Sequence, residues 1–210
     1  MKVLLVNGSS HPNGCTYTAL MEAAKVLEQE GIFCEMFQLG AGPIRDCIGC
    51  GGCARSEKGL CVFEDDCVNE LISRASESDG FIFGTPVYYA HPSGRILSAL
   101  DRAFYAAGKR AFAHKPGFAV ASARRAGTTA ALDAVLKHLT INQMPVVSST
   151  YWTMVHGNTP AEVLKDEEGL QTMRNGARNL AWLLKCIQAG KEQGIFPPQA
   201  EAASRTNFIR

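Results

Sequence analysis

Short apolar runs alternate with segments of helical periodicity along almost the whole chain, and this alternation limits the fold more than any other feature. The apolar runs predict strands at residues 2–6, 32–39, 80–83, 118–121 and 145–148. Uninterrupted apolar runs of this length are typical of strands that are buried on both faces. Because a helical segment follows each strand, the strands should lie parallel. The predicted fold class is α/β, a doubly wound five-stranded parallel sheet with helices on both faces.

The helical segments are recognised by apolar residues that recur three or four positions apart. The first begins near Thr16 and ends at Gly31. The acidic run at 166–168 lies just before the last helix and suits the positive end of a helix. After the first helix we expect four more, around residues 66–74, 97–104, 130–139 and 170–184.

The length of 210 residues and the hydrophobic content of 46% suit one domain with a sizeable core. We expect this domain to span residues 1–193, with a cysteine-rich insertion at 44–67, and a separate C-terminal tail to span 194–210. Pro197-Pro198 and the polar residues after it keep the tail out of the sheet. The tail is therefore either disordered or an arm laid on a partner subunit.

Charge and hydropathy argue against two classes of partner. Positive and negative side chains nearly cancel, with a net charge of +1, so neither nucleic acid nor an anionic membrane finds an electrostatic footprint. No apolar run approaches the roughly 20 residues that span a bilayer. The N-terminal apolar run is also too short for a signal peptide. We expect a cytoplasmic protein with no nucleic-acid or membrane partner.

Loops that follow the strands should meet at one edge of the sheet, where a doubly wound fold binds its ligands. The first loop, residues 8–16, is rich in glycine and hydroxyl groups and leads from a strand into a helix. Its backbone N–H groups therefore suit a phosphate, and an ordinary capped turn is the alternative. The loop has neither the Gly-Lys-Ser/Thr of a P-loop nor the Gly-x-Gly-x-x-Gly spacing of dinucleotide folds.

Two further loops carry aromatic and basic side chains. Residues 84–94 hold two adjacent tyrosines, which either stack on a planar ligand or form a surface turn with one ring packed inward. Residues 122–129 hold two arginines, which either bind the phosphates of a nicotinamide nucleotide or face solvent. His156 follows the last predicted strand on the same edge, and we expect a structural role for it.

Four of the eight cysteines lie between residues 47 and 61, and three of them form a Cys-x2-Cys-x2-Cys run. Three thiolates on one glycine-rich loop suit the wrapping of a cubane iron–sulfur cluster, with a fourth ligand from the next cysteine. A tetrahedral zinc site, a disulfide or redox pair, and free thiols are the alternatives. Zinc sites usually come as two paired knuckles, and the cytosol disfavours disulfides.

Several segments together resemble a known family. Asn7-Gly8-Ser9, the run 84–89 and Asp101-Arg102 resemble the NADPH-dependent FMN reductase family of the flavodoxin superfamily, and the match runs from residue 1 to about residue 190. The cysteine segment resembles the iron–sulfur flavoprotein branch of that family. The resemblance implies a flavodoxin-like fold, FMN bound without a covalent link, NAD(P)H as co-substrate, and the option of one [4Fe-4S] cluster.

The resemblance also implies which residues hold these groups. Around the FMN phosphate it implies Ser9, His11, Asn13, Cys15 and Thr16. Along the ribityl chain and the isoalloxazine ring it implies Pro86, Val87, Tyr88 and Tyr89, and near the ring edge Ser122, Arg124 and Gly127. The cluster would be held by Cys47, Cys50, Cys53 and Cys61. Family members often have arginine in place of His11 and asparagine in place of Cys15, so phosphate binding here leans more on backbone donors.

The predicted activity is that of an FMN-dependent NAD(P)H oxidoreductase, in which the flavin and no side chain carries the catalytic chemistry. Electrons would pass from a nicotinamide nucleotide to a quinone, nitro, azo or flavin acceptor, or through the cluster to a protein acceptor. The alternatives are an electron carrier reduced by ferredoxin and a flavin-free regulatory or binding module. Proteins of this family form dimers or tetramers, so we expect a homodimer or a homotetramer.

Overall fold

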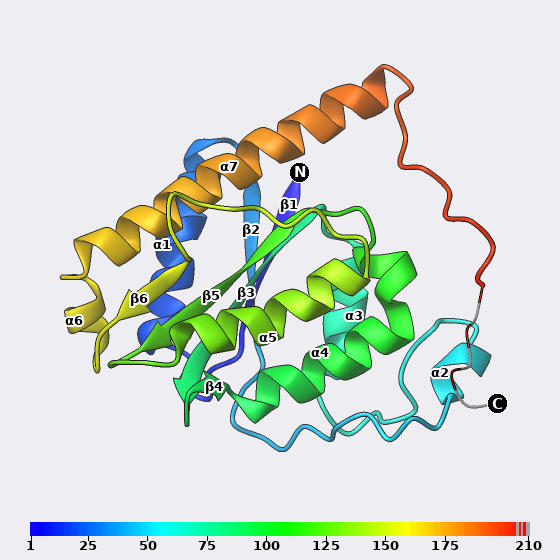
Figure 1. Cartoon of the computed structure of the whole chain (residues 1–210), viewed down its shortest axis with the longest axis horizontal. Helices are drawn as coiled ribbons and strands as arrows, with labels where there is room; N and C mark the ends of the chain where they lie inside the picture. The colour runs from blue at the N-terminus through cyan, green and yellow to red at the C-terminus, as the bar shows by residue number, and fades with distance from the viewer. Residues whose placement is uncertain (205, 207, 209–210) are drawn as a thin grey trace.

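The central sheet is parallel and has the strand order β2-β1-β3-β5-β6 (Figure 1). The structure is a computed structural model that describes residues 1–204, 206 and 208. The parallel strands are β1 (Lys2–Asn7), β2 (Phe33–Gln38), β3 (Gly80–Tyr88), β5 (Gly117–Ala123) and β6 (Met154–His156). The two-residue strand β4 (His91–Pro92) pairs antiparallel with the end of β3. The strand order reverses beside β1, which is the switch point of a doubly wound sheet.

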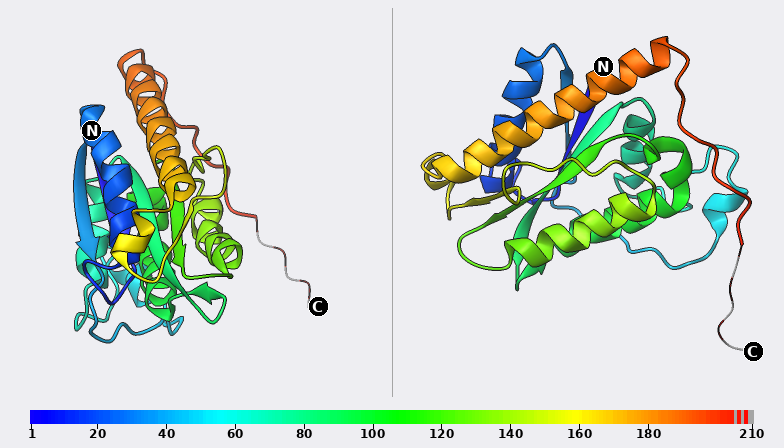
Figure 2. Two further views of the ribbon diagram at one scale, coloured as in Figure 1. Left: turned by 90° about the vertical axis from the view of Figure 1, so that its left-hand side faces the viewer. Right: turned by 45° about the horizontal axis from the view of Figure 1, so that its top comes forward.

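Helices cover both faces of this sheet, as predicted (Figure 2). One face packs against α1 (Cys15–Gln29), α6 (Pro160–Val163) and α7 (Glu167–Glu192). The other packs against α3 (Val68–Ser76), α4 (Gly94–Ala107), the π-helical turn η1 (Gly108–Phe112) and α5 (Thr128–Ile141). The short helix α2 (Gly52–Arg55) lies within the cysteine segment.

Alternate residues of β1 face opposite helical layers, which divides the core into two halves. Val3 and Leu5 pack on the side of α1 and α7, whereas Leu4 and Val6 pack on the side of α3 and α4. None of the four is more than 1% exposed. This burial on both faces is the reason why the strand is an unbroken apolar run in the sequence.

The fifth parallel strand is not where the sequence predicted it. Residues 145–148 form only an isolated bridge, between Val146 and Gly117 at the start of β5, and the strand itself is β6, beside residues 121–123. Pro145 has no N–H for a strand ladder, and the polar run that follows leaves the sheet before β6 begins. The sheet edge is therefore shared by two short segments.

Helix α7 ends in a Schellman motif, and the tail begins there. The N–H of Ile195 donates to the carbonyl of Gly190 at 2.9 Å, and the N–H of Gly194, whose φ is +80°, donates to that of Lys191 at 3.0 Å. The described residues of the tail form no helix or strand and run down the side of the molecule that carries α2 (Figure 1). Residues 205, 207 and 209–210 of the predicted 194–210 tail lie outside the described residues.

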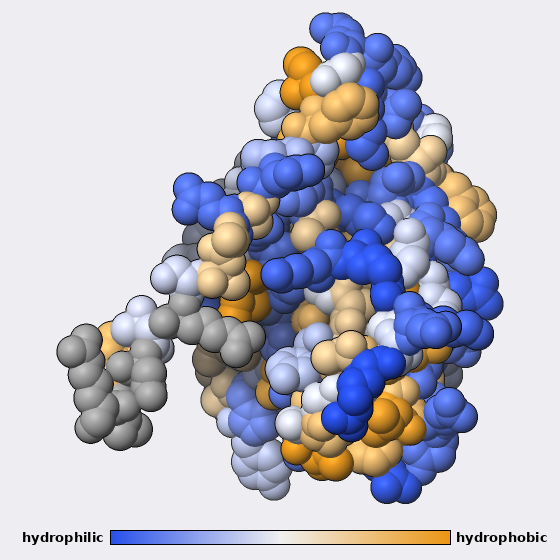
Figure 3. All heavy atoms as spheres, turned by 90° about the vertical axis from the view of Figure 1, so that its right-hand side faces the viewer, coloured by the Kyte–Doolittle hydropathy of each residue, from blue (hydrophilic) through white to orange (hydrophobic). Residues whose placement is uncertain are grey.

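The side of the molecule that carries α2 and the tail is shown in Figure 3. Hydrophobic and hydrophilic side chains mingle over it, with hydrophobic ones closest together at its lower end and a hollow near its centre. Ile48 and Val62 of the cysteine segment are among the exposed apolar side chains of the protein. Among the described helices, none has both the length and the apolar character needed to cross a membrane.

Candidate functional site

A cavity of about 690 Å³ opens at the carboxyl edge of the sheet. The loops that follow β1, β3, β5 and β6 form its walls. Doubly wound sheets bind ligands at this edge, and the volume is usual for a cofactor site. Its lining residues are Ser9, His11, Pro12, Asn13, Gly14, Cys15, Thr16, Pro86, Val87, Tyr88, Ser122, Ala123, Arg124, Gly157, Asn158, Thr159 and Pro160. We call it the edge cavity.

The edge cavity brings together all the residues expected to bind FMN except Tyr89 and Gly127. The turn at 157–160, which also lines the cavity, was not predicted. Its signal is its position directly after a strand that ends at this edge, and the misplacement of that strand at 145–148 hid it. The role of each residue toward FMN stays a prediction.

The amino end of α1 faces the edge cavity with its first backbone N–H groups uncapped. Gly14 is the N-cap, no side chain in the described part of the chain caps this helix, and its first turn holds no acidic residue. The N–H groups of the first turn and the positive end of the helix dipole are therefore available to an anion. This donor set fits the phosphate of FMN.

Side chains from β1 and β2 hold the loop in front of α1. The N–H of Ser9 donates to Asn7 Oδ1 at 3.1 Å, and Gln38 Nε2 donates to the carbonyl of Ser9 at 2.6 Å. The N–H of His11 in turn donates to Ser9 Oγ at 3.1 Å. Asn7 is fully buried, and its Nδ2 has no partner among the described residues. The loop is thus fixed from beneath before any ligand binds.

Two contacts join separate walls of the edge cavity. Thr16 Oγ1 and Ser122 Oγ lie 2.8 Å apart, and both residues are buried. Cys15 Sγ donates to the carbonyl of Gly157 at 3.6 Å. Burial raises the pKa of the Cys15 thiol, so this side chain is a neutral donor at neutral pH. Cys15 therefore fastens the turn at 157–160 to α1.

The outer wall of the edge cavity is the hairpin of β3 and β4. Tyr88 lines the cavity, whereas Tyr89 is 99% exposed at the hairpin turn. Tyr89 and Ala90 have φ angles of +50° and +63°, as the two central residues of a tight hairpin turn require. Of the two tyrosines expected along the ring, the structure places Tyr88 on the cavity wall and Tyr89 in the turn beyond the last residue of β3, away from the lining. The contact of either ring with FMN stays a prediction.

Gly127 supports this hairpin and does not line the cavity. Its φ is +99°, and a Cβ atom there would lie 2.6 Å from Ala90 Cα and 2.8 Å from Val87 Cγ1. The glycine thus allows the loop after β5 to approach the hairpin closely. It contributes to the site through Val87, which does line the cavity.

His156 lies outside the edge cavity. Its backbone N–H donates to Asp166 Oδ2 at 2.6 Å, and its imidazole lines a separate hollow beside the start of α7. Asp166 also caps α7 by accepting the N–H of Gly169 at 2.9 Å. The structural role expected for His156 stays a prediction.

The four clustered cysteines line one small cavity between the cysteine segment and α4, which we call the cysteine cavity. Gly49 and Gly51 both have a φ of +65°, a conformation that favours glycine and lets the loop fold back on itself. Across the described chain, no three His, Cys, Asp or Glu side chains converge as ligands of one metal ion.

Arg102 of α4 forms one wall of the cysteine cavity and is a buried charge. Its side chain is 0% exposed and pairs with the carboxylate of Asp66, which is 3% exposed. Asp66 Oδ1 also accepts the N–H of Val68 at 3.1 Å, at the start of α3. Burial alone raises the pKa of the Asp66 carboxyl, but the hydrogen bond from Arg102 and that from Val68 outweigh burial and leave this pKa below its ordinary value.

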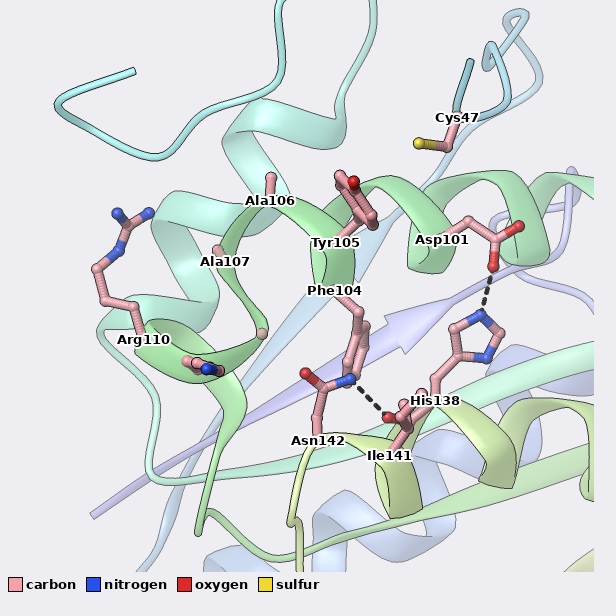
Figure 4. Close-up of a pocket in the computed structure, with 12 residues that line it drawn as sticks. Cys47, Asp101, Phe104, Tyr105, Ala106, Ala107, Arg110, His138, Ile141 and Asn142 are labelled. Atoms are coloured by element: carbon pink, nitrogen blue, oxygen red, sulfur yellow. Dashed lines mark hydrogen bonds and ion pairs between the residues drawn. The ribbon is translucent and has the colours of Figure 1, made fainter. Parts of the chain in front are cut away.

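A further cavity of about 650 Å³ lies at the carboxyl end of α4 (Figure 4). Cys47, Tyr105 and Ala106 line both it and the cysteine cavity, whereas the edge cavity shares no described lining residue with either. His138 Nε2 lies 2.7 Å from Asp101 Oδ1 on its wall. The walls of this cavity come from Cys47, the end of α4 with η1, and the end of α5, which are far apart in the chain.

Comparisons with known proteins agree with the family expected from the sequence. The family model described as NADPH-dependent FMN reductase matches residues 1–159. An iron–sulfur flavoprotein of Methanocaldococcus jannaschii is 32% identical over 195 residues, which cover 90% of this chain and 100% of that protein. A second iron–sulfur flavoprotein of the same organism is 29% identical over 198 residues, with coverage of 88% and 98%.

Solved structures share the fold at lower sequence identity. A flavone reductase has a TM-score of 0.68 at 18% identity, with coverage of 90% of this chain and 64% of that chain. An NAD(P)H:quinone oxidoreductase from Methanothermobacter marburgensis has a TM-score of 0.63 at 18% identity, with coverage of 86% and 96%. A flavodoxin from the domain Archaea has a TM-score of 0.58 at 12% identity, with coverage of 88% and 99%. The flavodoxin-like fold is thereby confirmed, and the chain belongs to the NADPH-dependent FMN reductase family.

Proposed function

We propose that this chain is an FMN-dependent NAD(P)H oxidoreductase that binds FMN in the edge cavity. The observation that carries the proposal is the meeting of the loops after β1, β3 and β5 around a single cavity of about 690 Å³. These loops are far apart in the sequence, and each contains residues that the family resemblance assigns to FMN. Membership of the FMN reductase family supports the same cofactor.

Each wall of the edge cavity has a separate task in this proposal. The uncapped end of α1 binds the phosphate, because its backbone donors need no charged side chain. Pro86, Val87 and Tyr88 flank the ribityl chain and the ring and exclude water from them. Ser122 and Arg124 approach the ring edge, where the exposed arginine is available to a phosphate of the nicotinamide nucleotide.

Bound FMN would supply the hydride and electron chemistry, so the protein needs no acid or base for the hydride step. The protein instead fixes the cofactor. The loop held by Asn7 and Gln38 positions the phosphate end, and the hairpin braced by Gly127 positions the ring end. The two ends of FMN are therefore positioned by two different loops at the same edge of the sheet.

We also propose that Cys47, Cys50, Cys53 and Cys61 hold one [4Fe-4S] cluster in the cysteine cavity. A zinc ion needs four sulfurs about 2.3 Å from a single atom, whereas the thiolates of a cubane bind four different irons and stand around a larger volume. All four cysteines line one cavity, and three of them lie on a single loop, which suits the cluster better than the two paired knuckles of a zinc site. Relatives named iron–sulfur flavoprotein add support. A bound cluster would supply one-electron transfer.

The electron acceptor depends on which of the two sites delivers the electrons. The edge cavity would serve a quinone, a nitro or azo compound, or a free flavin, and the NAD(P)H:quinone oxidoreductase among the structural neighbours favours a quinone. Exposure of Cys47 and Cys50 favours a second candidate, an electron carrier that exchanges electrons with ferredoxin through the cluster. The cytoplasmic location stays a prediction that either function would suit.

Protein purified without air tests both proposals. We expect flavin absorption bands, stoichiometric FMN, about four irons per chain, and bleaching of the flavin bands by NADPH or NADH. Colourless protein that takes up no FMN would refute the oxidoreductase and favour the alternative of a flavin-free regulatory or binding module. A flavin that is bleached by reduced ferredoxin and not by NAD(P)H would establish the carrier. Flavin bands without iron would refute the cluster and leave the reductase.

A further inference from the structure

Three arginines of α4 and its π-helical extension contact the cysteine segment or the residues just before it. Arg95, Arg102 and Arg110 are seven and eight positions apart, a spacing that puts them on one face of a helix. Arg95 Nη1 donates to the carbonyl of Gly42 at 2.5 Å, and Arg110 Nη2 donates to that of Gly59 at 3.2 Å. The two outer arginines therefore bind only backbone carbonyls, Arg95 just before the segment and Arg110 within it.

The central arginine differs because it also contacts a cysteine sulfur. Arg102 Nε lies 3.2 Å from Cys61 Sγ and donates to it. Its Nη1 donates to the carbonyl of Arg45 at 3.2 Å and also pairs with Asp66. Its Nη2 donates to the carbonyl of Phe63 at 3.2 Å. One planar guanidinium thus fixes the chain both before the three-cysteine run and after it.

Burial makes this arrangement different from a surface ion pair. A guanidinium removed from water is tolerated only when its charge and its donors are paired. Asp66 neutralises the charge of Arg102, and the ring of Phe63 lies 5.2 Å from its Cζ. Two carbonyl groups and the Cys61 sulfur accept from three further N–H groups. The sulfur contact is therefore one part of a buried site in which each guanidinium nitrogen has a partner.

We propose that Arg102 is a positioning residue for the fourth cysteine: it holds the Cys61 sulfur at the cysteine cavity and hydrogen-bonds that sulfur when a cluster is bound. The positioning role stands without a metal, whereas the second half rests on the cluster part of the proposed function. Hydrogen bonds to ligating sulfurs stabilise the more negative, reduced form of a cluster and so raise its reduction potential. Lysine cannot replace this group, because a compact ammonium lacks the planar fork.

The variant Arg102→Lys tests the proposal, and Arg110→Lys is its matched control. The control removes a contact between the same helical layer and the same segment, but no contact to sulfur. In metal-free protein the amides of Cys61 and Val68 are held by Asn69 and Asp66, respectively. Hydrogen exchange of these amides should quicken by about tenfold or more in R102K and keep its wild-type rate in R110K.

In protein reconstituted with iron and sulfide, an anaerobic redox titration gives the second readout. The midpoint potential should fall in R102K and stay at the wild-type value in R110K, with circular dichroism used to check that each variant keeps its fold. Unchanged amide exchange in R102K overturns the positioning role. Faster exchange with an unchanged potential overturns the hydrogen bond to the bound sulfur.

Two further outcomes remain decisive. Wild-type protein that binds FMN but no iron refutes the cluster and with it the second half of the proposal, while amide exchange still decides positioning. If R102K does not fold, the Nε–H resonance of Arg102 in wild type is compared with that in Cys61→Ala. A shifted and faster-exchanging resonance supports the sulfur contact, and an unchanged resonance overturns it.

Discussion

At the scale of single residues, the Thr16–Ser122 pair shows how the walls of the edge cavity depend on one another. The hydroxyl oxygens lie 2.8 Å apart and are buried, so each satisfies the other. Thr16→Val should lower the free energy of unfolding by about 1–3 kcal/mol, because it leaves the Ser122 hydroxyl unpaired. The double variant T16V/S122A should recover much of that loss in urea unfolding. A double variant as unstable as the sum of both single variants would contradict the pairing.

Gly127 gives a second prediction at this scale. Gly127→Ala places a Cβ atom against the backbone of Ala90. It also puts alanine at a position where φ is +99°. It should destabilise the protein by about 1–3 kcal/mol and weaken FMN binding through Val87. Gly42→Ala is the control, because a Cβ there meets nothing within 4 Å. Thermal unfolding and an FMN titration compare the two, and equal effects would show that close approach at Gly127 is unimportant.

The buried pair of Asp66 and Arg102 predicts a dependence of stability on pH. The folded-state pKa of Asp66 lies below its ordinary value, so the stability that its carboxylate contributes is complete at neutral pH and is lost as the pH falls below about 4. Asp66→Asn should cost about 3–5 kcal/mol at neutral pH, because Arg102 keeps a buried charge without a counter-charge. Urea unfolding should show that the difference in free energy of unfolding between wild type and Asp66→Asn becomes smaller in acid. A constant difference would exclude the ionised pair.

The sequence identified residues that a local motif marks and overlooked those defined by distant partners. Ser9, Thr16 and Ser122 were expected in the site because the family resemblance assigns them to FMN, and each belongs to a segment predicted as a loop after a strand. The burial of Arg102 depends on Asp66, 36 positions away, and no local pattern encodes it. Only the regular spacing of the three arginines was readable as a helix face, and it does not say what that face contacts.

At the scale of elements, the turn between β3 and β4 is strained in a way that can be relieved. Tyr89 and Ala90 both have positive φ angles, which Asn-Gly adopts more readily. The double substitution Tyr89→Asn and Ala90→Gly should raise the free energy of unfolding by about 0.5–1 kcal/mol. Since Tyr89 is 99% exposed, FMN affinity should stay unchanged. A clear loss of affinity would restore Tyr89 to the flavin site.

The elements themselves were predictable wherever burial imposes one clear period. The apolar or helical patterns of β1, α1 and the first four residues of β3 match the structure, whereas β3 continues to Tyr88 through residues that the sequence predicted as a loop. The prediction of the fifth strand was wrong because 145–148 and β6 are both short and apolar. Only the pairing with β5 decides between them. Choice of partner is a tertiary effect that no window of sequence contains.

At the scale of the whole molecule, the expected homodimer or homotetramer stays a prediction. Ile195 and Phe196, at the start of the tail, are 67% and 69% exposed, and Trp182 of α7 is 67% exposed. Apolar side chains of this size are often covered by a partner. Deletion of residues 196–210 should therefore reduce the assembly size measured by sedimentation. An unchanged assembly would show that the tail is not the arm that holds the subunits together.

The separation of the edge cavity from the cysteine cavity has a consequence for how such a protein matures. No described residue lines both cavities. If FMN and a cluster bind as proposed, we therefore expect flavin to load without iron and to stay bound when iron is lost. Under that proposal, a cell short of iron would accumulate flavin-loaded chains without a cluster, and oxygen damage at the cysteines could be repaired with the flavin in place.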